Sequence, residues 1–74
     1  MRSIELVVGT EKKRTVIPIA SVWAEMLMQK NSIKLLQVMS IAHGVDWDKV
    51  IYARIEIDDP DTGFSMHNLL DCAG

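Results

Sequence analysis

The spacing of apolar residues changes twice along the chain, and this change most restricts the folds that the chain can adopt. In the first twenty residues, apolar side chains alternate with others at Ile4, Leu6 and Val8, and again around Ile17. An alternating pattern predicts strands with one buried face, and the stretch GTEKK between them predicts a hairpin turn. Pro18 cannot donate a hydrogen bond to a neighbouring strand, so we expect the second strand to lie at an edge of the sheet or to end early.

From residue 21 the apolar residues recur at helical spacing, which predicts helical structure as far as residue 43. Ser21 and Ser32 are residue types that cap helix N-termini, and Gly44 suits a helix C-terminus. The stretch KNS at residues 30–32 interrupts the pattern. One bent helix and two separate helices are both compatible with the sequence.

Alternation returns in the last third of the chain. The stretch KVIYARIEID at residues 49–58 is rich in β-branched side chains, and beyond a turn Phe64 and Met66 alternate with polar neighbours. The sequence therefore predicts a single α+β domain over residues 1–74, in the order β-β-α-α-β-β. We expect an antiparallel sheet with both helices packed on one face.

The stretch DPDTG at residues 59–63 has the composition of either a metal-binding loop or a turn. Aligned on the calcium-loop pattern by its glycine, it places Pro60 and Thr62 at ligand positions and Leu69 at the closing position. Proline offers no side-chain ligand and leucine cannot coordinate an ion. Asp59 and Gly63 instead suit the ends of a tight turn, so the sequence predicts a turn without metal.

No other residues form a specific catalytic or metal-binding motif. His43, His67, Asp71 and Cys72 have the chemistry of metal ligands, but no two of them have the close spacing of a zinc site. No serine lies in a Gly-x-Ser-x-Gly context, and there is no glycine-rich phosphate loop. A chain of 74 residues also has little volume in which to enclose a substrate. We expect no enzymatic activity, no metal and no cofactor.

The segment SIAHGVDWDKVIYARI at residues 40–55 resembles the helix-turn-helix motif. It has a small residue, Ser40, a turn glycine, Gly44, and hydrophobic residues at positions 45 and 50. This resemblance implies a small transcription regulator in which Lys49 and Arg54 contact DNA. Against it stand two aspartates at positions 46 and 48, the strand-like alternation that follows, and a net charge of −2. DNA binding is therefore the second hypothesis.

Apolar residues are more numerous than so small a domain can readily bury. They make up 49% of the chain, and in each predicted helix they cover more than the stripe of about 100° that a helix on a sheet needs. In the second helix Val38 belongs to one broad apolar arc, whereas Ser40 lies on the more polar side. The excess indicates tight packing between the helices or a contact surface for another chain. The candidate contact residues are Trp23, Met26, Met28, Ile33 and Ile41.

Charged residues gather at the two predicted hairpin turns. Such groups are usually only solvated, but opposite charges at two ends of a molecule also suit steering toward a charged partner or a second copy. The basic group is Lys12, Lys13 and Arg14, and the acidic group is Glu56, Asp58, Asp59 and Asp61.

These features predict a small, non-catalytic interaction module: a regulator, an inhibitor of the type encoded by mobile elements, or an accessory subunit. We expect it to dock on a protein through an apolar helical face and charged hairpin tips, and to form a homodimer. The lone Cys72 fits a reducing compartment, so we expect a cytoplasmic protein. The apolar runs fall well short of about 18 residues, so we expect no membrane partner.

Overall fold

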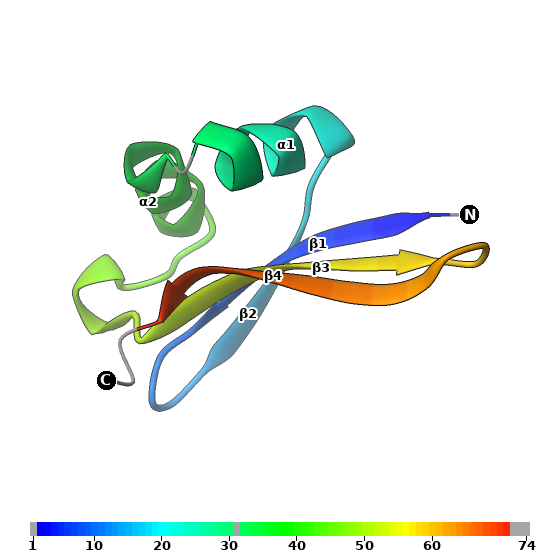
Figure 1. Cartoon of the computed structure of the whole chain (residues 1–74). Coiled ribbons are helices and arrows are strands. Elements are labelled where there is room, and N and C mark those ends of the chain that lie inside the picture. The colour runs from blue at the N-terminus through cyan, green and yellow to red at the C-terminus, as the bar shows by residue number, and fades with distance from the viewer. Residues whose placement is uncertain (1, 31, 72–74) are drawn as a thin grey trace.

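A computed structural model describes residues 2–30 and 32–71, which form a four-stranded antiparallel sheet and two α-helices on one of its faces (Figure 1). The predicted fold class and element order are confirmed, with a short 3₁₀-helix added after the second α-helix. The elements in chain order are β1 (Ser3–Gly9), β2 (Arg14–Pro18), α1 (Ser21–Lys30), α2 (Ile33–Ala42), the 3₁₀-helix (Trp47–Lys49), β3 (Tyr52–Asp59) and β4 (Gly63–Asp71).

The two central strands of the sheet come from opposite ends of the sequence. The strand order is β2-β1-β3-β4, so β1 pairs with β2 on one side and with β3 on the other. Leu6 lies opposite Ile17 in β2 and Ile55 in β3, and all three side chains are buried in the core against the helices. β2 is an edge strand, as Pro18 predicts.

Local capping interactions define the ends of α2. The Ser32 hydroxyl accepts a hydrogen bond from the Leu35 amide at 3.2 Å, which confirms Ser32 as the cap. At the other end Gly44 has a φ of +80°, a conformation that favours glycine, and the Val45 amide donates to the Ser40 carbonyl at 3.0 Å. This arrangement ends the helix and returns the chain toward the sheet, where Val45 joins the core.

The structure settles the number of helices and corrects one capping assignment. α1 and α2 are separate helices. Ser21, the predicted cap of α1, is instead its first residue, because the carbonyl of Ala20 accepts the first helical hydrogen bond, from the Ala24 amide at 3.2 Å. Ala20, and not Ser21, is therefore the residue that precedes the helix. The Ser21 side chain is exposed.

α2 rests on the sheet through part of the apolar arc that the sequence indicates, since Leu36 is buried and Leu35 and Met39 pack partly buried against the core. Its buried residues are Leu36 and Ser40, whereas Val38 is 57% exposed. Ser40 is tolerated in the core because its hydroxyl donates to the Leu36 carbonyl at 2.7 Å and is thereby satisfied within the helix. A serine whose hydroxyl bonds to the backbone of its own helix does not need to face solvent. A helical wheel places every polar residue on the solvent side, and it therefore assigns Ser40 to the wrong side.

The β3–β4 hairpin turn forms at DPDTG, as predicted. Asp59 and Gly63 are the closing pair, and the Asp59 carboxylate accepts the amide of Asp61 at 2.8 Å and, more weakly, that of Thr62 at 3.4 Å. Gly63 has a φ of +89°. A side-chain acceptor at the first position and a left-handed residue at the last are the usual requirements of a three-residue hairpin loop.

Replacing Gly63 by valine should lower the free energy of unfolding by roughly 1 kcal/mol or more, because a β-branched residue is strained at positive φ. Chemical denaturation measures the effect, and Thr62→Val in the same loop is the control, with a change within about 0.5 kcal/mol. Because the Asp59 carboxylate serves the turn, calcium should leave the melting temperature unchanged. Saturable stabilisation by micromolar calcium would show that the loop binds metal.

Candidate functional site

Both helices expose large apolar side chains. Six large apolar residues among those described on α1 and α2 are each more than 40% exposed, although each helix also buries residues against the sheet. Burial of only a narrow stripe on each helix leaves the remainder of its apolar arc in contact with solvent. These six residues, here called the helical surface, are Val22, Trp23, Met26, Ile33, Val38 and Ile41.

The helical surface contains four of the five candidate contact residues and two residues that the sequence did not single out. Met28 differs from the other candidates because it is only partly exposed and packs against the core. Val22 and Val38 were missed because a broad apolar arc does not reveal which part of it faces the sheet. The tertiary structure makes that choice.

Charged side chains near the helical surface are mostly basic. Lys30 at the end of α1 and Lys34 at the start of α2 are both exposed, and neither belongs to the ion pairs found among residues 2–30 and 32–71. Glu25 is the acidic residue of these helices and is also exposed. The end of the helical surface where α1 meets α2 therefore carries positive charge.

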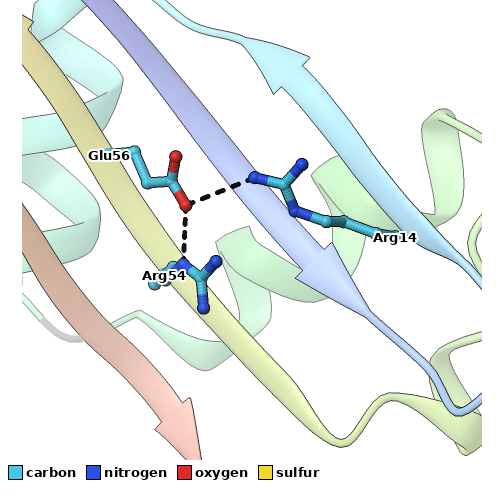
Figure 2. A network of polar contacts seen from close by, with 3 residues as sticks. All are labelled: Arg14, Arg54 and Glu56. Atoms are coloured by element: carbon cyan, nitrogen blue, oxygen red, sulfur yellow. Dashed lines mark hydrogen bonds and ion pairs between the residues drawn. The ribbon is translucent and has the colours of Figure 1, made fainter.

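The opposite face of the sheet, here called the open face, carries a charge network at its centre. Figure 2 shows Arg14 reaching from β2 across β1 toward Glu56 on β3. The Glu56 carboxylate accepts a hydrogen bond from Arg54 Nε at 2.7 Å and lies 3.5 Å from Arg14 Nη2. Its side chain is only 12% exposed, so the two guanidinium groups are its principal partners.

The strand register explains what this network covers. Arg14 is the β2 partner of Gly9 and Glu56 is the β3 partner of Glu5, so their ion pair crosses β1 diagonally above Val7. Val7 lies on the open face, because its neighbours in β1 face the helices, and yet it has no exposed surface. Charged side chains thus shield an apolar residue that the helices cannot reach.

The network also changes the interpretation of the two charged groups. The sequence predicts Arg14 in the basic tip and Glu56 in the acidic tip, but the structure pairs them with each other at the centre of the sheet. The remaining tip residues lie at opposite ends of the sheet (Figure 1), since β1 and β3 run antiparallel. Of the residues assigned to the two groups, Lys12, Lys13, Asp58 and Asp61 are exposed and Asp59 is partly buried in its turn, while Glu11 is an exposed acidic residue beside the two lysines.

Gly9 is required where β1 meets the start of β3. A Cβ at Gly9 would overlap the ring of Tyr52, its partner in register. The guanidinium of Arg54 lies 5.1 Å from the centroid of the same ring, a distance suited to a cation–π interaction. Gly9 therefore lets the tyrosine lie flat on the sheet beside the charge network.

The segment that resembles a helix-turn-helix motif does not form its second helix. After α2 the chain makes the 3₁₀-helix and then β3, so the position of a recognition helix is occupied by a turn and a strand. Arg54 is engaged with Glu56, and Lys49 lies 3.9 Å from Asp46. The helix-turn-helix structure that the resemblance implies is therefore wrong for residues 40–55. Alternating β-branched residues after position 50 favour a strand more strongly than the spacing of Ser40, Gly44 and Val45 favours a second helix.

Other kinds of site find little support in residues 2–30 and 32–71. An open cleft of about 490 Å³ between the β1–β2 turn and the 3₁₀-helix has side chains of both charges, including Lys12, Lys49 and Asp48. No group of three metal-ligand side chains occurs within the described ranges, where His43 and His67 are both exposed. Cys72 lies outside those ranges. No helix among the described elements is long and apolar enough to cross a membrane.

Comparisons with known proteins assign no family to the chain. A scan against protein-family models, a search of curated proteins and a search of solved structures each found no match.

Replacing Gly9 by alanine should lower the free energy of unfolding by roughly 1 to 3 kcal/mol, because the new methyl group displaces the Tyr52 ring. Chemical denaturation measures this effect. In the double variant with Tyr52→Ala the methyl group meets no ring, so its additional cost should be much smaller. Additive costs in the double variant would contradict the close packing of Gly9 against Tyr52.

Replacing Glu56 by glutamine should lower the free energy of unfolding by roughly 1 kcal/mol, because both guanidinium groups lose their anionic partner. Glu5→Gln is the matched control on the paired strand. Like charges directly opposite one another repel, so removal of the Glu5 charge should leave stability unchanged or slightly raised. Equal losses for both variants would show that the network has no special role.

Proposed function

We propose that this protein is a small, non-catalytic interaction module whose helical surface binds another protein. The observation that carries this proposal is the exposure of six large apolar side chains on two ten-residue helices. Single exposed apolar residues are common on protein surfaces, but a concentration of them on one layer is typical of a binding site. Trp23 and Met26 are residue types enriched at the centres of interfaces.

The charges beside the helical surface indicate the chemistry of the partner. Lys30 and Lys34 are exposed near the junction of the two helices. A complementary partner would present an apolar patch bordered by carboxylates, since opposite potentials favour encounter and orientation. The binding partner proposed for the helical surface is therefore a different protein, with acidic residues around its apolar patch.

The hairpin tips would contribute to orientation rather than to affinity. Lys12 and Lys13 at one end and Asp58 and Asp61 at the other give the molecule an electrical asymmetry along the sheet. Exposed charges of this kind contribute little binding energy but affect the rate of association. A regulator, an inhibitor and an accessory subunit would all require docking of this kind. The lone cysteine is typical of a reducing compartment and supports a cytoplasmic location.

Site-specific crosslinking tests the helical surface directly. A photoreactive residue at Val38 should capture a defined partner in the source cell, whereas the same residue at Val16, on the open face, should not. With the purified partner, Ile41→Glu should weaken binding at least tenfold, or about 1.4 kcal/mol. The reason is that a carboxylate would be placed in a desolvated apolar contact that also faces acidic groups.

The folded state of the variant separates an interface from a core. Ile41 is 54% exposed, so Ile41→Glu should keep a native circular dichroism spectrum. Leu36→Glu, on the buried stripe of the same helix, should unfold the chain, because an unpaired charge in the core costs several kcal/mol. The proposal fails if Ile41→Glu stays folded and binds the partner as tightly as the unmodified chain.

A further inference from the structure

The two edges of the sheet differ in how well they are protected against pairing with another strand. β2 has five residues and includes Pro18 and Arg14, features that discourage strand addition. β4 has nine residues, and residues 63–70 contain no proline and no formally charged side chain, although 24% of the whole chain is charged. Long, uncharged edges are the ones that pair with other strands.

The first part of β4 is both exposed and regular. Every residue from 63 to 68 is exposed, and Phe64 and Met66 are 60% and 54% exposed. The register with β3 runs without interruption from Gly63 to Asn68 and shifts only beyond that point, between Ala53 and Arg54. Six consecutive residues therefore present an accessible, undistorted strand edge.

We infer that β4 pairs in antiparallel fashion with β4 of a second copy, which joins the two sheets into one. The twofold axis would lie at Ser65, near the middle of the regular stretch, so that Phe64 of each copy lies opposite Met66 of the other. A second copy fits this edge because residues 63–68, which would pair, carry no formal charge and do not repel one another, whereas β2 is shorter and contains Pro18.

The side chains of β4 also favour a second copy of the chain as the partner of this edge. Phe64 and Met66 lie on the open face, because their β3 partners Asp58 and Glu56 alternate with the buried Ile57 and Ile55. Opposite residues of an antiparallel pair share a face of the sheet. Self-pairing with the open faces aligned would bring the Phe64 and Met66 side chains of both copies together and shield them from water. It would also place both pairs of helices on the other face.

Lysine substitutions on the two faces of β4 test the strand pairing by sedimentation equilibrium, at protein concentrations up to about 1 mM. The side chains at positions 65 and 66 point to opposite faces of the sheet. A lysine at either position nevertheless places two like charges near the twofold axis of the dimer. Each should weaken the dimer at least about tenfold. Val16→Lys, on the other edge strand, and Ile41→Lys, on the helical surface, should leave the dimerisation constant within about twofold.

Each alternative outcome overturns the inference. Loss of the dimer in Met66→Lys but not in Ser65→Lys would indicate stacking of the open faces. Loss in Ile41→Lys alone would indicate contact through the helices. An unmodified chain that stays monomeric at about 1 mM would exclude self-pairing at concentrations where weak interfaces are detected.

Amide hydrogen exchange of the unmodified chain provides a measurement that does not depend on the folding of a variant. If β4 pairs with itself, alternate amides between Gly63 and Asn68 should become protected as the protein concentration rises. The amides of β2 should show no such dependence, since the β2 edge stays in solvent. Protection of β4 that does not change while the dimer forms would place the interface elsewhere.

Discussion

The pairing of β1 with β3 is the contact on which the rest of the structure depends. It joins residues 3–9 to residues 52–58, so two hairpins that could each form locally become one sheet. Bringing together segments so distant in sequence has an entropic cost. Burial of Leu6 and Ile55, which face each other across this pairing with no exposed surface, offsets that cost. The helices between the hairpins are thereby returned to one face.

The central strands use both of their faces for stability. One face contacts the helices, and the other is covered at Val7 by the ion pair between Arg14 and Glu56. Little of β1 or β3 is therefore accessible to another molecule. Most of the exposed large apolar side chains lie on the outer parts of the helices and on β4, with Val16 on β2 and Ile51 before β3 as the others. The two proposed contacts follow from this distribution.

The helical surface and the β4 edge are compatible with simultaneous use. They involve different elements, and pairing of β4 with the open faces aligned leaves both helical surfaces uncovered on the same side of the joined sheet. A dimer of this form would present two copies of the helical surface to a partner. Two linked sites bind a partner that is itself multivalent more strongly than either site alone, without any new contact.

The sequence by itself determined the order of elements, the edge position of β2, the cap at Ser32 and the turn at residues 59–63. Each of these depends on side-chain period or on the chemistry of one or two neighbouring residues, and such information is local. The exposure of Trp23 and Ile41 could be anticipated only as part of an apolar excess, without knowledge of which residues would be covered.

Only the tertiary structure decided which stripe of each helix is buried, because that depends on how the helix is rotated against the sheet. Ser40 is buried and Val38 exposed for this reason, against their polarity. The same limit applies to Arg14 and Glu56, which are distant in sequence and meet because β1 separates their strands by a single step. Strand order is a long-range property, and the spacing of residues within one segment does not encode it.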